Sequence, residues 1–246
     1  MPCVNELSPT AEHIFLTAMD LFRSQGYAKT NIRQIAEQSE VSLGLVNHHF
    51  GSKRQLGYLV LETLIRYVIG QFDISSEKQN KNMLFYDAAE TRAVNCYLSH
   101  GPFRQFYLDT LEEDIFFNYL EQNSSFLLEQ LQTTYGFTIS HDMALLYCRY
   151  IPYMVEKTLV LKKAQGLFPG ISEEEIPYQI FASTYSGRVP REELLRADAW
   201  GREITPQILA KLEPTPSSTV LRTAGLLPAS EHRTKAGQRQ STQYCL

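Results

Sequence analysis

Apolar residues recur at helical spacing along most of the chain, and residues 30–53 contain two short helices joined by a tight turn. The polar break after the first helix ends its pattern, and Ser42 is a favourable N-cap for the second, in which Val46 and Phe50 face inward. The apolar positions of the first helix stand at i, i+3 and i+4: Ile32, Ile35 and Ala36. Helix, turn and helix in this order are typical of a helix-turn-helix, whose second helix enters the major groove of DNA.

Start and stop signals predict helices along the rest of the chain as well. Ser8 followed by Pro9 begins a helix that ends before Gly26, and Ser52 with Gln55 forms a capping box for a helix reaching about residue 72. No strand-type alternation is present, so we expect an all-α fold. Further helices are predicted near 83–99, 102–113, 114–122, 124–134, 141–165, 172–186 and 190–212.

The pattern divides the chain into two domains and a tail. Residues 1–55 form the small helix-turn-helix domain, the fourth helix (53–72) connects it onward, and 73–212 form a larger helical domain that begins with a polar stretch at 73–82. From 213 to 246 the sequence is rich in Pro, Ser, Thr, Arg and Gln and poor in apolar residues. We therefore predict a disordered tail, either an extension without a role or an arm that contacts DNA.

Several residues between 42 and 54 are unfavourable for a helix unless an anion lies nearby. Gly44 stands inside the second helix, where glycine costs roughly 1 kcal/mol relative to alanine. Lys53 and Arg54 occupy the first turn of the next helix, where cations oppose the helix dipole. The run at 47–49, Asn-His-His, can hydrogen-bond to base edges and phosphates. Adjacent helical residues project about 100° apart, so the two histidines are a poor metal site.

These spacings resemble the N-terminal domain of the TetR family of transcriptional regulators over residues 10–60. The matching segments are Ala18 to Phe22, Gly26-Tyr27, Thr30-x-x-x-Ile-Ala, Val41-Ser42-x-Gly44 and His49-Phe50-x-x-Lys53. The resemblance implies a three-helix DNA-binding domain joined by a fourth helix to a larger ligand-binding and dimerisation domain.

The resemblance also implies which residues bind DNA. Ser42, at the start of the second helix, is one of the residues expected to bind DNA. Phosphate contacts are implied for Thr30, His49 and Lys53, and base-edge or groove contacts for Asn31, Leu43, Gly44, Asn47 and His48. The chain departs from the family pattern at Leu43, Leu45 and Asn47. A thymine-methyl contact from Leu43 and a bidentate adenine contact from Asn47 are the readings that these departures allow.

Charge supports a DNA-binding face only locally. The whole chain carries a net charge of −4. Residues 23–54, however, contain five lysines and arginines and two glutamates, and the local face governs electrostatic attraction to DNA.

The larger domain is dense in aromatic residues, with sixteen Phe and Tyr between 83 and 168. Aromatic residues at helical spacing form cores more often than pockets, but several tyrosine hydroxyls need partners, and rings with polar tips are typical of small-molecule sites. Pro152 should kink the helix over 141–165 and open space for a ligand. The candidate ligand contacts are Asn95, His100, Phe103, Tyr107, Tyr147 and Ile151.

The last two predicted helices, 172–186 and 190–212, carry apolar stripes that include Ile176, Leu194 and Ile208. In the family such helices pair with their copies, so the resemblance implies a homodimer formed through these C-terminal helices, with two recognition helices on successive turns of a near-palindromic operator. The alternative is a helical hairpin packed only within its own chain.

The resulting hypothesis is a homodimeric repressor that a small apolar or aromatic ligand releases from double-stranded operator DNA. Two alternatives stay open: a regulator whose larger domain binds a protein partner, and a helical enzyme. The chain shows no spaced carboxylate pair, no Ser/His/Asp set and no cofactor loop, so we expect no enzyme and no cofactor.

The remaining sequence features point to a soluble cytoplasmic protein. The four cysteines are scattered without metal-ligand spacing, so we expect neither a metal site nor a disulfide framework. Cys148 lies in an apolar helix and is either a small core residue or a thiol sensor. The first residues lack the pattern of an export signal, and no apolar segment reaches membrane-spanning length.

Overall fold

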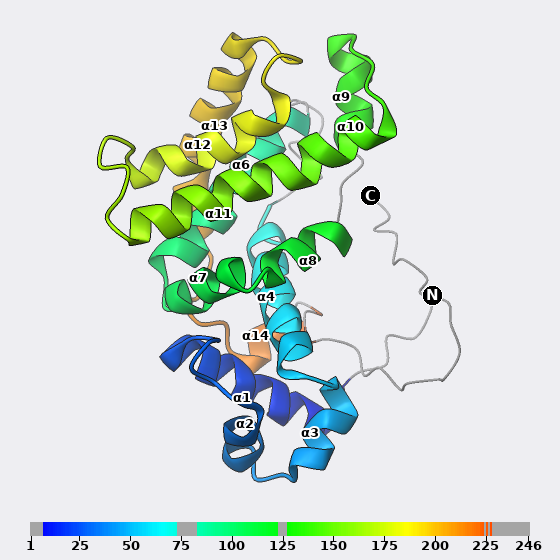
Figure 1. Cartoon of the computed structure of the whole chain (residues 1–246), viewed down its shortest axis with the longest axis vertical. Helices are drawn as coiled ribbons and strands as arrows, with labels where there is room; N and C mark the ends of the chain where they lie inside the picture. Colours follow the sequence, from blue (N-terminus) through cyan, green and yellow to red (C-terminus); the bar gives the residue numbers. More distant parts are fainter. Residues whose placement is uncertain (1–6, 73–82, 123–126, 224, 226, 228–246) are drawn as a thin grey trace.

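The computed structural model describes residues 7–72, 83–122, 127–223, 225 and 227, and within them the fold is all-α (Figure 1). The helices are α1 (Pro9–Gln25), α2 (Ile32–Gln38), α3 (Leu43–Phe50), α4 (Lys53–Ile69), α6 (Met83–His100), α7 (Arg104–Glu112), α8 (Ile115–Gln122), α9 (Leu127–Tyr135), α10 (His141–Leu145), a π-helix η1 (Leu146–Tyr150), α11 (Ile151–Ala164), a 3₁₀ turn η2 (Glu173–Glu175), α12 (Ile176–Tyr185), α13 (Arg191–Leu209) and α14 (Ser218–Thr223). We call α1–α3 the head and α6–α13 the body.

The head is built by local signals that the sequence displays. The hydroxyls of Ser8, Ser42 and Ser52 accept hydrogen bonds from the backbone N–H three residues on, and so cap α1, α3 and α4 as predicted. Inside the head, Val46 and Phe50 are buried, as expected. α3 is therefore fixed by its inner face and presents its outer face away from the body, at one end of the molecule (Figure 1).

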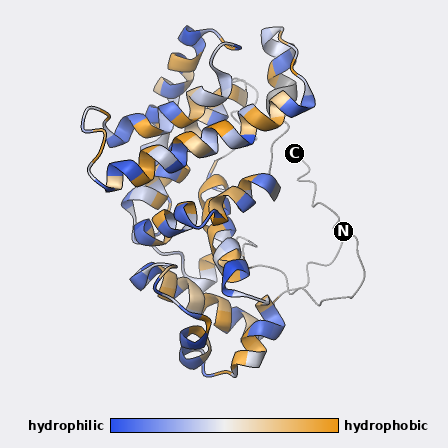
Figure 2. Cartoon of the chain, viewed as in Figure 1, coloured by the Kyte–Doolittle hydropathy of each residue, from blue (hydrophilic) through white to orange (hydrophobic). Residues whose placement is uncertain are grey.

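α4 joins the head to the body and ends at Ile69, three residues before the predicted end, with Gly70 as its C-cap. The predicted polar junction at 73–82 lies outside the described residues. A single apolar core runs from α1 through α4 into the body, and Figure 2 shows the hydrophobic stretches beside hydrophilic ones on these helices. The head and the body thus share one continuous buried cluster.

The predicted helix over 141–165 forms with a π turn in its middle. Pro152 has no N–H to donate, and just before it the N–H of Ile151 bonds the carbonyl of Leu146, five residues back. This is the spacing of a π-helix, and it is how the chain accommodates the proline that we expected to kink the helix.

The apolar stripes of the C-terminal helices pack within their own chain. α13 lies along α6, and α12 lies between α11 and α6. Ile176, Leu194 and Ile208 are each at most 5% exposed. Most of the apolar surface of these two helices thus stabilises the body within one chain, while Leu195 stays 46% exposed, and the expected dimer contact through 172–186 and 190–212 stays a prediction.

The start of the tail predicted from residue 213 belongs to the described structure, whereas residues 224, 226 and 228–246 of that tail lie outside the described residues. The chain turns back after α13 and forms α14, whose Leu221 is fully buried in the main core. The sequence lacks a long apolar stripe here: Leu221 is the buried contact of α14, and Val220 and Leu227 pack beside it.

Within the described residues, no helix is long and apolar enough to cross a membrane.

Candidate functional site

The outer face of α3 exposes most of the residues expected to touch DNA. Val46 and Phe50 anchor the helix, and His49 is half-buried next to Phe50. The residues of this segment that are exposed to solvent are Ser42, Leu43, Gly44, Asn47 and His48. An amide, an imidazole and an isobutyl group on one exposed face can read base edges by hydrogen bonds and by contact with thymine methyl groups.

Gly44 is free of steric constraint in the protein. A Cβ atom placed there would meet the Ser42 hydroxyl at 3.8 Å, an ordinary van der Waals distance, and no other atom within 4 Å. The folded chain therefore does not explain the glycine. Close approach of the α3 backbone to an external partner would explain it.

Gly44→Ala is expected to raise the stability of the head by roughly 0.5–1 kcal/mol, because alanine is the better helix former. The same change should weaken DNA binding, since the methyl group stands between the backbone and the groove. Thermal unfolding and DNA titration of the variant measure both effects. A variant that is more stable and binds DNA as well as the wild type would remove Gly44 from the interface.

Thr30 and Asn31 directly precede α2, and their side chains differ in exposure to solvent. The Asn31 side chain is exposed and forms a capping box with Gln34, at 3.0 and 2.8 Å. Thr30 is 1% exposed, and its hydroxyl donates to the Gly26 carbonyl at 2.7 Å. The expected phosphate contact from the Thr30 side chain is therefore corrected: this hydroxyl holds the α1–α2 turn and does not reach the surface.

Lys53 is anchored inside the head. Its ammonium donates to the carbonyls of Tyr27 (3.1 Å) and Thr30 (2.9 Å) and lies 3.9 Å from the centre of the Tyr27 ring. Burial lowers the pKa of this ammonium. Arg54 likewise donates to the carbonyls of Glu113 and Asp114. Lys53 and Arg54 are unfavourably placed at the positive end of the α4 helix dipole. Protein carbonyl oxygens, and not the phosphate expected from the sequence, thus offset this cost.

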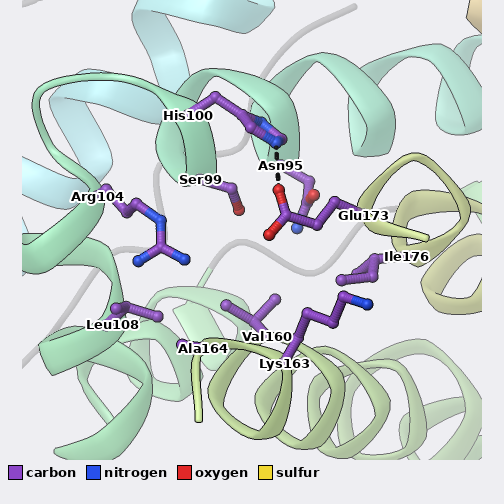
Figure 3. A pocket seen from close by; sticks show the side chains of 10 residues that line it. All are labelled: Asn95, Ser99, His100, Arg104, Leu108, Val160, Lys163, Ala164, Glu173 and Ile176. Atoms are coloured by element: carbon purple, nitrogen blue, oxygen red, sulfur yellow. Dashed lines mark hydrogen bonds and ion pairs between the residues drawn. The ribbon is translucent and has the colours of Figure 1, made fainter. Parts of the chain in front are cut away.

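A small, open hollow, with about 20 Å³ of space for the centres of water-sized molecules, lies between α6, α7, α11 and the start of α12 (Figure 3). At its mouth the His100 imidazole pairs with Glu173 at 3.0 Å. The lining residues are Asn95, Ser99, His100, Arg104, Leu108, Val160, Lys163, Ala164, Glu173 and Ile176. Polar groups on one side and aliphatic groups on the other suit a small amphipathic molecule.

Two of the six expected ligand contacts, Asn95 and His100, line this hollow. Phe103 and Tyr107 are fully buried in the core. Tyr147 and Ile151 are half-buried elsewhere on the π turn and α11, with the Tyr147 ring covered by the Arg188 guanidinium at 3.3 Å. These four residues therefore do not line this hollow, and their roles as ligand contacts stay predictions, because an aromatic or apolar residue at helical spacing has the same pattern in a core and in a pocket.

Beside the hollow lies a buried polar cluster of Asn95, Tyr107 and Glu156. Glu156 is not among the residues expected from the sequence. Asn95 donates to the Tyr107 hydroxyl at 3.3 Å, and this hydroxyl donates to the Glu156 carboxylate. Burial raises the pKa of Glu156 to about 7, although the hydrogen bond from Tyr107 opposes the shift. A carboxylate in the middle of an apolar helix was the available signal, and its partner lies 49 residues away.

α7 connects the hollow to the head. Arg104 and Leu108 line the hollow, and on the same helix the buried Asp109 carboxylate accepts a hydrogen bond from the Ala28 N–H at 2.7 Å. A Cβ at Gly26 would lie 2.6 Å from the same carboxylate, so the turn after α1 needs glycine both for its φ of +85° and for this close approach.

Comparison with known proteins gives a family for the head. Residues 14–57 match the family model described as bacterial regulatory proteins, tetR family. The HTH-type transcriptional repressor Rv3405c of Mycobacterium tuberculosis is 50% identical over 54 residues, which are 22% of this chain and 29% of that repressor. The HTH-type transcriptional regulator HbdR of Aromatoleum sp. is 40% identical over 52 residues, 21% of this chain and 23% of the regulator. The matched part thus spans less than a third of these relatives.

Among solved structures, a gamma-butyrolactone receptor described as ArpA-like aligns over 80% of this chain and 97% of its own, with 16% identity and a TM-score of 0.47.

Proposed function

We propose that the chain, whose residues 14–57 match the tetR family model, is a homodimeric, ligand-responsive transcriptional repressor of that family. The observation that carries the proposal is the exposed face of α3, which presents Gly44, Asn47 and His48 to solvent, and where no steric contact within the described residues requires the glycine. A second copy supplies the second reading helix, and the two copies bind a near-palindromic operator.

The proposed contacts follow exposure. Asn47 and His48 reach base edges, with Leu43 and the Gly44 backbone against the groove floor. Asn31, Ser42 and His49 contact phosphates or sugars. Thr30 and Lys53 keep the α1–α2 turn in place, and Lys53 adds positive potential there without a dedicated phosphate.

A stripe of exposed apolar residues on α10, η1 and α11 is the proposed dimer contact. Its members, spaced three or four residues apart and 40–56% exposed, are Met143, Leu146, Tyr150 and Met154. Such a stripe faces solvent at a free-energy cost, and a two-fold axis would bring it against its own copy. It replaces the predicted contact through the last two helices.

The effector is proposed to be a small, largely apolar or aromatic molecule with a polar end, bound in the hollow between α6, α7, α11 and α12. Its entry would displace α7, and the bond from Asp109 to Ala28 would carry that movement to the head. A differential affinity of about 3 kcal/mol between the two head positions would weaken operator binding by about 150-fold.

The test is selection of bound DNA from a random pool with the purified full-length chain at moderate salt. Recovery of a near-palindrome is the expected result, and this operator then serves to screen molecules that release it. If nothing is enriched, even after denaturing and refolding the protein to strip a bound ligand, the proposed function is wrong.

Two variants separate base reading from phosphate contact. Asn47→Ala is expected to relax the preference at one position per half-site, a change of about 1–3 kcal/mol in discrimination, because it removes a base contact. His49→Ala should weaken binding to all sequences alike. Selection repeated with each variant measures both. An equal loss of affinity for all DNA sequences in Asn47→Ala would show that this side chain contacts the DNA backbone and not a base.

A further inference from the structure

The segment that follows α13 returns to the head instead of leaving the molecule. We call residues 213–223 the brace. Figure 1 shows its helix α14, in orange, beside α1. The body and the head are therefore connected by α4, by α7 and by this third segment from the other end of the chain.

The first part of the brace is fastened to α4 and α6 by backbone hydrogen bonds. The Glu213 N–H donates to the Tyr67 hydroxyl at 3.0 Å. The Tyr97 hydroxyl lies 3.2 Å from each of the Glu213 and Pro214 carbonyls. Both tyrosine side chains are buried, so the start of the brace is held in a fixed position relative to the body.

The far end of the brace is fastened to the first turn of α1. Leu221 is fully buried in the core that head and body share. The Arg222 guanidinium donates to the Glu12 carboxylate at 2.7 Å. The Glu12 side chain is only 11% exposed, so Arg222 compensates a nearly buried charge.

We propose that the brace is a positioning element for DNA binding: by holding α1 against the body, it fixes the direction in which each head faces. This inference rests on the proposed function. A dimer reads two half-sites at once only when both heads keep the required separation, whereas one head on one half-site needs no such constraint. Operator binding and docking of the brace must then favour each other.

The experiment reverses the charge at the ion pair in the full-length chain. Arg222→Glu places two carboxylates together and should release α14 from α1. The expected result is a loss of about 10-fold or more in affinity for the operator recovered by selection, with affinity for a duplex carrying one half-site changed by less than about 2-fold. Faster amide hydrogen exchange in 218–223 would report the release without DNA.

Two further variants make the result specific. The swap Glu12→Arg with Arg222→Glu restores the pair and should restore operator affinity to within about 3-fold of the wild type. Arg196→Glu reverses a guanidinium paired with Glu193 on α13 and should leave both duplexes bound as before. Tyr97→Phe tests the other end, and should weaken operator binding in the same direction.

Three results of these experiments would contradict the proposed role of the brace. Equal losses on the operator and the half-site, an unchanged Arg222→Glu variant, or a swap that does not recover would each overturn the brace as a positioning element. A wild-type chain that binds no DNA sequence would refute the proposed function itself, and with it the role of the brace. That result is distinguishable because it appears before any variant is made.

Discussion

Leu146→Asp is expected to turn the proposed dimer into a monomer and to weaken binding to a whole operator by about 100-fold or more. Leu146 stands in the middle of the exposed stripe on α10, η1 and α11 and is 40% exposed in the single chain. In a symmetric interface each substitution counts twice. A partner can cover only the exposed 40% of Leu146, so each copy loses about 1 kcal/mol of apolar burial and must also remove a carboxylate from water.

Light scattering or sedimentation of the variant measures the oligomeric state, and titration of the operator measures the loss of affinity. Leu195→Asp is the matched control, because Leu195 is 46% exposed on α13, outside the stripe. It should stay dimeric. The reverse result, with Leu195→Asp monomeric and Leu146→Asp dimeric, would return the interface to the C-terminal helices that the sequence pattern suggested.

Glu156→Gln is expected to remove most of a loss of stability that the wild type shows as the pH rises. The pKa of Glu156 is raised from 4.5 to about 7, so the folded state holds a proton that the unfolded state has given up. Stability therefore falls between about pH 4.5 and pH 7 and stays low above it, by up to about 3 kcal/mol. Glutamine keeps the shape and the hydrogen-bond acceptor for Tyr107 but cannot ionise.

Unfolding by denaturant at pH 5 and at pH 8 checks this expectation. Asp87 also has a pKa raised by burial, to about 6, so part of the slope will survive in Glu156→Gln. Tyr107→Phe removes the donor that favours the ionised carboxylate, and should move the loss of stability to higher pH. A Glu156→Gln variant with the full wild-type slope would show that the carboxylate is ionised at little cost in the folded protein.

The head could be predicted from sequence in detail because its signals act over three or four residues. A serine before an apolar-periodic run caps the helix wherever the helix then packs, as at Ser8, Ser42 and Ser52. The same holds for the buried side of α3. The solvent-facing side chains of the reading helix follow from that burial without any knowledge of the body.

The packing partner of an apolar face could not be predicted, because periodicity states only that a face is buried. The stripe on α13 has the same pattern whether it meets α6 or a second copy, and the structure shows that it meets α6. Lys53 takes its role from contacts with residues that precede it by 23 and 26 positions in the chain. Glu156 takes its role from a contact with a residue 49 positions before it. Such contacts leave no trace in a local window of sequence.

The anchoring of Lys53 and Arg54 bears on how the head would behave in different ionic conditions. Both cations are engaged with backbone carbonyls, and Arg23 is paired with Asp20 at 3.3 Å, which leaves the exposed Lys29 and Arg33 as the freer positive charges of this segment. Few condensed counterions would then leave the DNA when the head binds, so its affinity would fall only gently as salt rises. A regulator of this kind discriminates by the fit of α3 in the groove, and keeps that discrimination when the ionic strength of its surroundings changes.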